Sequence, residues 1–187
     1  MRKLILSMGV TLDGLVARPG RHGAGGWGLP PEDPALKERK LEWFRNIDLH
    51  LMGRVTYEEM AEFWPTSDDA YAAPMNDIPK VVFSSTLERA EWAETRIARG
   101  ELAEEIAALK SEPGSEMLAW GGAAFAQSLS RLGLVDEYRL VLQPVALGNG
   151  LPLFDGLTAP LRLELVDAQT YNTGAALHVY RPVPPTS

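Results

Sequence analysis

Three short polar segments, each following an apolar strand, constrain this chain more than any other feature of its sequence. In chain order they are Leu51-Met-Gly-Arg-Val-Thr-Tyr-Glu58, Val81-Val-Phe-Ser-Ser-Thr-Leu87 and Met117-Leu-Ala-Trp-Gly-Gly-Ala-Ala-Phe125. Strands that end in Gly, Ser, Thr or Arg and open into helices are typical of open α/β sheets, where such ends build phosphate-binding crevices. Three of them in one small chain predict a nucleotide cofactor lying across the edge of the sheet.

The composition fits one globular domain and argues against two classes of function. Of the 187 residues, 45% are apolar and 23% are charged, which is an ordinary globular mix. The 18 basic residues are outnumbered by 25 acidic ones, whereas nucleic-acid binding needs clustered Lys and Arg. The chain has no cysteine, which excludes disulfides, a thiolate nucleophile and a cysteine-based metal site. We therefore expect no nucleic-acid partner.

The apolar run near the N-terminus is expected to be a buried strand. It follows two basic residues, as in a signal peptide, but it is short and Thr11-Leu-Asp-Gly14 interrupts it without a small-residue cleavage site. No apolar stretch approaches the ~20 residues that a membrane-spanning helix needs. We expect a cytoplasmic protein with no membrane partner.

The apolar periodicity predicts a mixed, mainly parallel α/β sheet of about eight strands with four helices on its faces. The strands are expected over residues 3–10, 50–53, 80–83, 91–96, 116–120, 137–145, 161–168 and 175–181. The helices are expected over residues 34–45, 56–63, 100–111 and 122–132, and a weak helical signal lies within 66–78.

The two ends of the chain differ in organisation. The last three expected strands have no helices between them, which predicts antiparallel strands added at the edge of the sheet. The Gly- and Pro-rich loop over 18–31 is longer than a simple connector, and such loops are usually functional or disordered. We expect residues 1–182 to form a single domain and 183–187 to form a flexible tail.

The segment Gly53-Arg54-Val55-Thr56 has the features of a phosphate-binding helix start. Gly53 allows a ligand to approach the backbone closely, and the N–H groups near Val55 and Thr56 are donors that the helix itself leaves unused. Arg54 adds a fork of donors suited to a phosphate. The alternative interpretation, an N-cap Thr56 beside a surface Arg54, carries equal weight on this segment alone.

The other two segments gain their value from position. Ser84, Ser85 and Thr86 are common turn formers, but one strand away from Arg54 their hydroxyls suit the 2′-phosphate that separates NADP from NAD. A Gly121-Gly122 pair is often only a tight turn. Between a strand and a helix it predicts a pyrophosphate cradle, with helix amides facing the anion.

Taken in order, the three segments resemble the dihydrofolate reductase superfamily. The closer resemblance is to the branch that is similar to the C-terminal reductase domain of bifunctional riboflavin-biosynthesis (RibD-type) enzymes. Three further stretches match that branch: Ser7-Met-Gly-Val-Thr-Leu-Asp-Gly14, Gly133-Leu-Val-Asp-Glu-Tyr138 and Gln143-Pro-Val-Ala-Leu-Gly-Asn-Gly-Leu-Pro-Leu-Phe154. The likeness spans roughly residues 3–180.

The resemblance implies a dihydrofolate-reductase-like fold with NADPH as the cofactor. Carried over by position, Arg54 and either Ser84 or Ser85 would meet the 2′-phosphate. Thr56 and the amides near it would meet the phosphate bridge.

The glycine-rich segment departs from the superfamily pattern at one point. By resemblance, Gly121, Gly122 and Ala123 would cover the pyrophosphate and the nicotinamide side. Where dihydrofolate reductases often have a third glycine and a basic residue, this chain has Ala123 and Ala124. The resemblance therefore implies contacts from backbone amides there, not from side chains.

Two carboxylates are candidate catalytic residues. The stretch Trp27-Gly-Leu-Pro-Pro-Glu32 resembles the one that carries the buried catalytic carboxylate of dihydrofolate reductases, which aids protonation of the substrate ring. Glu32 would be its equivalent, but its distance from Gly53 is several residues too long for a plain alignment, and first-turn acids also cap helices, which is the interpretation we favour. Asp13 would border the substrate side of the cleft in this branch, with a simple turn Asp before Gly14 as the alternative.

Aromatic residues and histidines complete the candidate site. Trp27 and Trp64 are positioned to wall a ring-shaped substrate, whereas Trp43 has the helical spacing of a core residue. His22, His50 and His178 lack metal-ligand spacing, so we assign no metal site.

Three functions remain open from the sequence. The resemblance favours an NADPH-dependent reductase that transfers hydride to a C=N or C=O of a small pterin-, pyrimidine- or similar heterocyclic substrate. The second is the riboflavin-pathway 5-amino-6-(5-phosphoribosylamino)uracil reductase, for whose substrate phosphate the nearby cations are Arg18, Arg21 and Arg45. The third is a non-catalytic NADP(H)-binding sensor or interaction module. The branch commonly dimerises and the C-terminal strands offer an edge, so a homodimer is expected.

Overall fold

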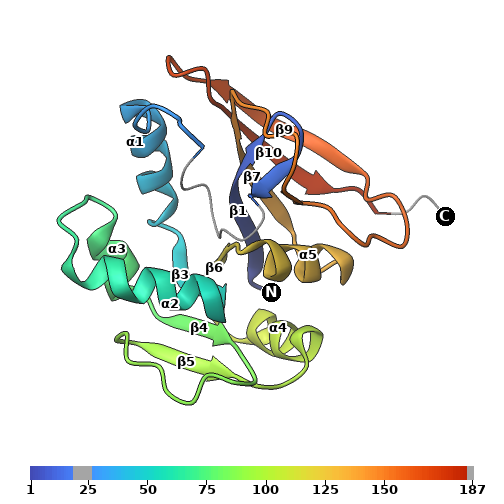
Figure 1. Ribbon diagram of the computed structural model, residues 1–187. Coiled ribbons are helices and arrows are strands. Elements are labelled where there is room, and N and C mark those ends of the chain that lie inside the picture. Colours follow the sequence, from blue (N-terminus) through green and yellow to red (C-terminus); the bar gives the residue numbers. More distant parts are fainter. Residues whose placement is uncertain (19–26, 185–187) are drawn as a thin grey trace.

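An eight-stranded mixed sheet forms the centre of the molecule. The computed structural model describes residues 1–18 and 27–184 (Figure 1). The strands of the sheet are β1 (Lys3–Thr11), β3 (Ile47–Gly53), β4 (Lys80–Phe83), β5 (Thr95–Ala98), β6 (Glu116–Trp120), β7 (Glu137–Gln143), β9 (Leu163–Thr170) and β10 (Ala176–Pro182). Their order is β5-β4-β3-β6-β1-β7-β10-β9. The first six run parallel, and β10 is antiparallel to both β7 and β9, which confirms the expected mixed sheet.

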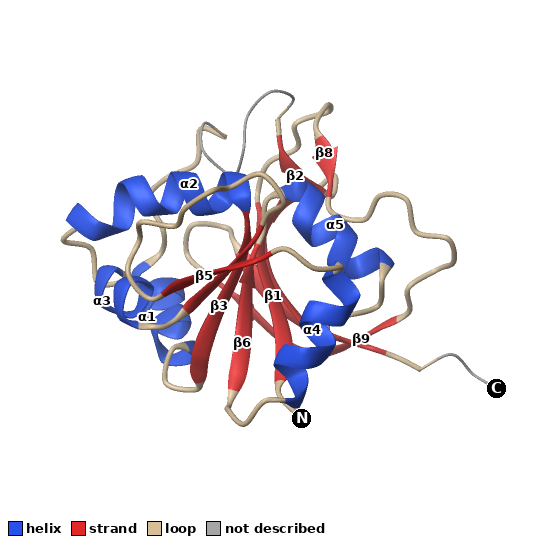
Figure 2. Cartoon of the chain, turned by 90° about the horizontal axis from the view of Figure 1, so that it is seen from below, coloured by secondary structure: helices blue, strands red, loops and turns tan. Residues whose placement is uncertain are grey.

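Helices cover both faces of this sheet. They are α1 (Pro34–Trp43), α2 (Arg54–Phe63), α3 (Ala72–Asp77), α4 (Leu102–Ser111) and α5 (Ala123–Arg131), and a 3-10 turn over Trp64–Thr66 follows α2. Figure 2 shows α1, α2 and α3 on one side of the sheet and α4 and α5 on the other. Within the described ranges, no helix has the length and apolar character to cross a bilayer.

The strands divide their side chains between these two layers because successive residues of a strand point to opposite faces. In β1, Leu4 and Leu6 belong to the core beneath α4 and α5, whereas Ile5 packs on the α1 side. In β6, Met117 and Leu118 make the same division. All five side chains are fully buried, as central parallel strands require.

A second sheet of two very short strands was not predicted. β2 (Leu15–Ala17) pairs with β8 (Leu151–Pro152) beside the carboxyl ends of β1 and β7. Strands of three and two residues are too short to show alternation in a sequence. The Gln127 side chain on α5 donates to the Pro152 carbonyl at 2.8 Å and ties this small sheet to α5.

The structure corrects two of the expected strands. The strand after α5 is not an antiparallel edge strand: β7 lies inside the sheet and pairs parallel with β1. It is parallel because α5 carries the chain back to the end of the sheet at which β6 begins. β5 covers Thr95–Ala98, not 91–96. The apolar signal at Trp92 comes from packing against Tyr57 of α2, whose hydroxyl accepts the Trp92 N–H at 3.0 Å.

The expected loop over 18–31 and tail over 183–187 lie partly outside the described residues, and Arg21 and His22 lie wholly outside them.

Candidate functional site

The structure brings the three polar strand ends together at one edge of the sheet. β4, β3 and β6 are neighbours, Gly53 pairs with Phe83, and Met52 pairs with Trp120. Since all three strands are parallel, the residues after Gly53, Phe83 and Trp120 emerge side by side. We call this the cofactor edge.

Two helices begin at the cofactor edge with unused backbone donors. Gly53 is the N-cap of α2 and Gly122 is the N-cap of α5, both are extended, and neither helix start has a side-chain cap. The first amides of each helix therefore keep donors that the helix cannot satisfy. α2 begins at Arg54 instead of Thr56, so Thr56 is the third helical residue and not an N-cap as in the alternative interpretation.

The two helix starts approach each other closely. A Cβ on Gly122 would lie 3.0 Å from the Thr56 Oγ1, and a Cβ on Gly121 would overlap the Met8 side chain of β1. The starts of α2 and α5 thus lie side by side, and we call the space that a Gly122 Cβ would occupy the gap. Two adjacent helix starts with unused amides suit an anion.

A groove of about 440 Å³ lies beside the starts of the two helices, at Gly53 and Ala124, and reaches the end of β5 at Ala98. It is bordered by Gly53, Ser84, Ser85, Arg99 and Phe125 among others, whereas Thr86 is not part of its lining. The Ser84 Oγ accepts the N–H groups of Thr86 at 3.2 Å and Leu87 at 2.9 Å. Because the hydroxyl oxygen is used as an acceptor, its proton stays available to donate to a ligand.

Arg99 is a groove residue that the sequence did not reveal. Its guanidinium donates to the carbonyls of Ser85 at 3.3 Å and Leu87 at 2.5 Å, so it fixes the turn that carries the serines. Arg99 directly follows β5, and the expected strand at 91–96 ended too early to mark it as a strand-end residue. The signal was therefore present, but the misplaced strand hid it.

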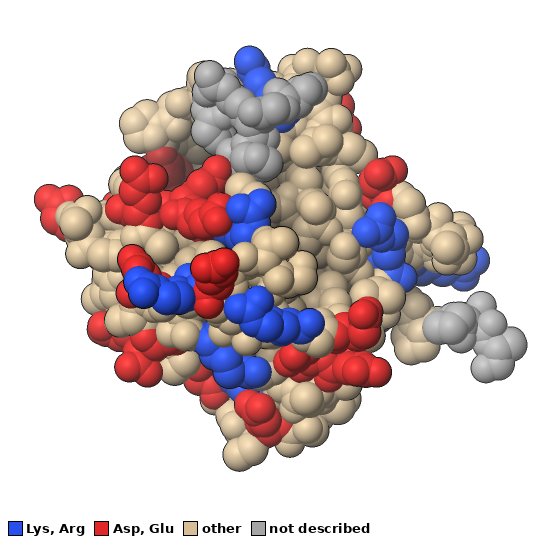
Figure 3. Space-filling view, turned by 60° about the horizontal axis from the view of Figure 1, so that its bottom comes forward, with Lys and Arg blue, Asp and Glu red and all other residues tan. Residues whose placement is uncertain are grey.

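Arg54 lies at the start of α2, and its side chain forms an exposed ion pair. Its Nη1 donates to both carboxylate oxygens of Glu58 at 3.0 Å, and 45% of its side chain is exposed. An exposed pair of this kind contributes little to stability, so Arg54 can exchange Glu58 for a phosphate at small cost. Figure 3 shows basic and acidic side chains interspersed on the face formed by α2, β5 and α4.

Asp13 is used to hold a turn. Its carboxylate accepts from the Thr11 hydroxyl at 2.5 Å and from the amides of Leu147 and Gly148 at 3.0 and 2.7 Å. These hydrogen bonds lower the pKa of the exposed Asp13 carboxyl below its ordinary value, and the one from Thr11 has the largest effect. A lowered pKa is unfavourable for a proton donor near neutral pH.

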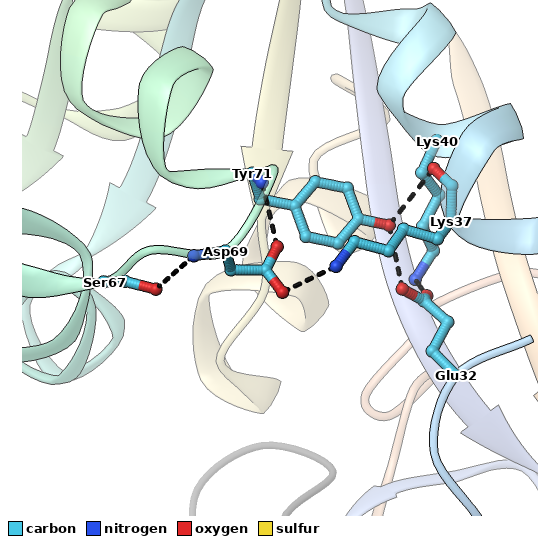
Figure 4. Close-up of polar contacts among 6 residues, drawn as sticks. All are labelled: Glu32, Lys37, Lys40, Ser67, Asp69 and Tyr71. Carbon is cyan, nitrogen blue, oxygen red and sulfur yellow. Dashed lines mark hydrogen bonds and ion pairs between the residues drawn. The ribbon is translucent and has the colours of Figure 1, made fainter. Parts of the chain in front are cut away.

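The carboxylate that caps α1 is Asp33, not Glu32. Asp33 is buried and accepts from the amides of Ala35 and Asn172, both at 2.9 Å. Glu32 instead pairs with Lys40 at 2.5 Å and accepts the Tyr71 hydroxyl at 2.8 Å, as Figure 4 shows. Sequence spacing could not separate two adjacent acids, because the choice depends on Asn172, which is far along the chain.

The Tyr71 ring joins α1 to the segment before α3. Lys37 of α1 pairs with Asp69 at 2.6 Å, and the Asp69 carboxylate also accepts the Tyr71 amide at 2.9 Å (Figure 4). Burial, and then the nearby Glu32 carboxylate, raise the pKa of the Tyr71 hydroxyl, so it stays a donor. Glu32 therefore connects Lys40 of α1 with Tyr71, which directly precedes α3.

Trp64 and Trp27, which were predicted to wall a substrate, both pack into the protein. Trp64 packs edge-on against Phe63 and Tyr71 in the cluster beneath α2 and α3. Trp27 is buried, and within the described part of the chain its indole N–H has no hydrogen-bond partner. Trp43 is a core residue, as its spacing predicted.

The buried His50 and the half-buried Trp120 form a pair next to the Gly-Gly segment. The Trp120 Nε1–H donates to His50 Nδ1 at 3.0 Å, and the other ring nitrogen lies 3.2 Å from the Pro74 carbonyl. An accepting Nδ1 requires the proton on Nε2, so this histidine is neutral. Burial lowers the pKa of His50 to about 4. No sequence pattern predicts this pair, because His50, Trp120 and Pro74 come from three separate elements.

Of the two cations named for a substrate phosphate that the structure describes, Arg18 lies toward the cofactor edge. It follows β2 and is exposed. Arg45 precedes β3 and therefore lies at the opposite end of the sheet, which excludes it from this site. Among the residues that the structure describes, no three His, Asp or Glu side chains gather to hold a metal ion.

Comparisons with known proteins agree with this architecture. YyaP, an uncharacterized protein of Bacillus subtilis (strain 168), is 30% identical over 184 residues, which cover 96% of this chain and 94% of YyaP. A provisionally assigned riboflavin biosynthesis protein from Shewanella sp. PV-4 has a similar structure, with a TM-score of 0.77, 23% identity and coverage of 97% and 99% of the two chains.

A longer protein shares the same fold. The diaminohydroxyphosphoribosylaminopyrimidine deaminase/5-amino-6-(5-phosphoribosylamino)uracil reductase of Thermotoga maritima matches with a TM-score of 0.68 and 16% identity, over 97% of this chain but 57% of its own. The family model described as the RibD C-terminal domain matches residues 2–177. The chain therefore belongs to the RibD C-terminal domain family.

Proposed function

We propose that this protein is an NADPH-dependent reductase acting on a small heterocyclic substrate. The observation that carries the proposal is the pair of uncapped helix starts that lie side by side at Gly122 and Thr56, beside the groove of Ser84, Ser85 and Arg99. A dinucleotide has two features that match it: a pyrophosphate for the gap and an adenosine 2′-phosphate for the groove. Family membership supports the same cofactor.

The residues at the edge would divide the cofactor between them. Amides of Val55, Thr56 and Ala123 would hold the pyrophosphate, and Arg54 with the serine hydroxyls would hold the 2′-phosphate. When bound, NADPH supplies the hydride, which reduces a C=N or C=O carbon while the neighbouring nitrogen or oxygen takes up a proton. The protein would accelerate the reaction mainly by fixing the two reactants in contact.

Neither candidate carboxylate is arranged as a proton donor. Asp13 is bonded to backbone amides and Glu32 is paired with Lys40. We therefore propose that both act through structure. Turnover of Asp13→Asn and Glu32→Gln within about tenfold of the parent supports this, whereas a loss of about 100-fold or more in kcat with an unchanged KM would identify a catalytic acid.

A second candidate is the riboflavin-pathway reduction of 5-amino-6-(5-phosphoribosylamino)uracil. The Thermotoga maritima protein, which shares this fold and is named as such a reductase, favours it. Its substrate carries a phosphate, for which Arg18, after β2, is a candidate that the cofactor assignment leaves unused.

Steady oxidation of NADPH tests the proposal. The protein is incubated with NADPH and, in turn, dihydrofolate, oxidised pterins and pyrimidine ribosyl phosphates, and loss of NADPH absorbance is followed. Turnover with any of them supports a reductase and assigns the substrate class. Binding of NADPH without turnover across the panel would favour a sensor or interaction module instead.

A further inference from the structure

The segment Gly121-Gly122 at the cofactor edge has no side chain of its own to hold it in place. Glycine has more backbone freedom than any other residue, so the segment keeps one conformation only if its neighbours fix it. On one side Gly122 is the N-cap of α5, and its carbonyl accepts the Ala126 N–H at 3.1 Å. On the other side Trp120, the last residue of β6, directly precedes the segment. The shape of the gap therefore depends on how Trp120 is held.

The Trp120 side chain is held by an aromatic ring and by a hydrogen bond. Its indole stacks on the ring of Phe44, which caps the end of α1, with ring centres 6.2 Å apart and planes inclined by 27°. Stacking alone lets an indole turn within its own plane. The Nε1–H, which donates to the His50 Nδ1 at 3.0 Å, removes that freedom because a hydrogen bond has a preferred direction.

His50 is a rigid acceptor for this hydrogen bond. It lies in β3, its side chain is fully buried, and Phe44 packs edge-on against its ring at 5.8 Å between centres. Its Nε2 lies 3.2 Å from the Pro74 carbonyl of α3, to which it donates its proton. With both ring nitrogens bonded, the imidazole connects α3 to Trp120 and so to the backbone that follows.

We propose that His50 is a positioning residue for the cofactor: its hydrogen bond to Trp120 holds Gly121-Gly122 in the arrangement that leaves the gap open. This inference rests on the proposed function, in which the gap is the pyrophosphate site. A segment that is not fixed beforehand must be ordered when the cofactor binds, and that ordering lowers the affinity. His50 acts here through the indole and does not touch the cofactor.

Variants at His50 separate this role from a contribution to stability alone. His50→Leu removes the acceptor and leaves the Trp120 N–H without a partner. His50→Asn keeps an acceptor, because the asparagine Oδ1 is as many bonds from the backbone as the histidine Nδ1. The matched control is Tyr138→Phe. Tyr138 is buried and its hydroxyl donates to the Ser130 Oγ at 3.1 Å, so the variant removes a buried hydrogen bond of similar length near the end of α5.

Cofactor affinity is the first measurement. Binding is followed by the fluorescence of the reduced nicotinamide and not of tryptophan, because the substitution alters the surroundings of Trp120. His50→Leu should weaken NADPH and NADH alike, by about tenfold, since the pyrophosphate is common to both. His50→Asn should recover most of that loss, and Tyr138→Phe should bind like the parent although its melting temperature is lower. Equal losses in His50→Leu and Tyr138→Phe, or a loss that His50→Asn does not recover, would overturn the proposal.

Hydrogen exchange without cofactor tests directly whether His50 holds the segment. The Ala126 amide is bonded to the Gly122 carbonyl, so it exchanges when this turn opens. The Glu105 amide, bonded in the same way to the Glu101 carbonyl at 3.0 Å in the first turn of α4, is the reference. His50→Leu should speed exchange at Ala126 about tenfold relative to Glu105, whereas Tyr138→Phe should leave this ratio as in the parent.

The two measurements distinguish a failure of this inference from a failure of the proposed function. If the parent binds NADPH while His50→Leu changes neither the affinity nor the exchange at Ala126, the inference alone is overturned. If the parent binds neither NADPH nor NADH, the proposed function falls, and exchange at Ala126 still decides whether His50 holds the glycine segment.

Discussion

Arg54 and Arg99 differ in the hydrogen bonds that each guanidinium makes within the protein. Among the residues that the structure describes, Arg54 forms an ion pair with the exposed Glu58 carboxylate alone, so a phosphate can replace that partner. Arg99 is bonded to the carbonyls of the turn that carries Ser84 and Ser85. Arg54 is thus suited to recognise a charge, and Arg99 to keep the serine turn in place.

Substitution of Arg54 by alanine should weaken NADPH binding about 10- to 100-fold, because hydrogen bonds to a charged phosphate are worth about 1.5–3 kcal/mol. Binding of NADH, which lacks the 2′-phosphate, should change little. Fluorescence titration with each cofactor measures both affinities. The control is Arg89→Ala, at a surface arginine that pairs with Glu91 and is more exposed than Arg54. Equal losses for NADPH and NADH would remove the 2′-phosphate assignment.

His50 is a buried neutral base, and this has a consequence for stability. Its pKa is lowered from 6.5 to about 4, chiefly by burial. Between these values the unfolded chain binds a proton that the folded chain excludes. The free energy of unfolding should therefore fall as the pH is lowered through this window.

Protonation of His50 should lower the free energy of unfolding by about 2 kcal/mol between about pH 7 and about pH 5. Urea unfolding at the two pH values measures it as the difference between the parent and His50→Gln, in which this titration is absent. His178→Gln, at a half-buried histidine on β10, is the control. The same pH dependence in the parent and in His50→Gln would contradict the assignment.

At the scale of elements, the cofactor edge depends on how closely α2 and α5 begin. Gly122 has φ −84° and ψ 154°, a conformation open to any residue, so alanine does not strain the backbone there. Its methyl group would nevertheless lie 3.0 Å from the Thr56 Oγ1 and fill the gap between the helix starts.

Gly122→Ala should therefore weaken NADPH and NADH alike, by about tenfold or more, since the pyrophosphate is common to both. The melting temperature should stay close to that of the parent, which a thermal scan checks. This pattern differs from that of Arg54→Ala, which discriminates between the cofactors. An unchanged affinity for both cofactors would show that the gap is not the pyrophosphate site.

Local sequence patterns predicted the elements that position the site and missed those that depend on distant contacts. β4 and β6 were found because each is an apolar run that ends in polar or glycine residues. β5 was displaced because Trp92, which packs on α2, mimics a strand residue. The pair β2 and β8 is too short for any periodic signal.

The same division holds for the candidate site. Gly53, Gly121 and Gly122 follow directly from strand–glycine–helix patterns. The roles of Asp13 and Asp33 do not, because each is set by amides more than 100 residues away in the chain, at Leu147 and Asn172. The prediction of NADPH as the cofactor rests on the family resemblance and not on the spacing of any one motif.

At the scale of the whole molecule, the parallel strands separate the two ends of the sheet. Their carboxyl ends form the cofactor edge, whereas Arg45, which precedes β3, lies at their amino ends. The cofactor edge is therefore confined to one end of the sheet.

The most direct test of the account is titration of the protein with NADPH and, separately, with NADH, following tryptophan fluorescence. Trp120 directly precedes Gly121, so a cofactor at this edge should quench its emission. The account predicts saturable quenching with a strong preference for NADPH. Absence of binding by either cofactor would mean that the three strand ends are only turns and helix caps, and the proposed reductase would fall with them.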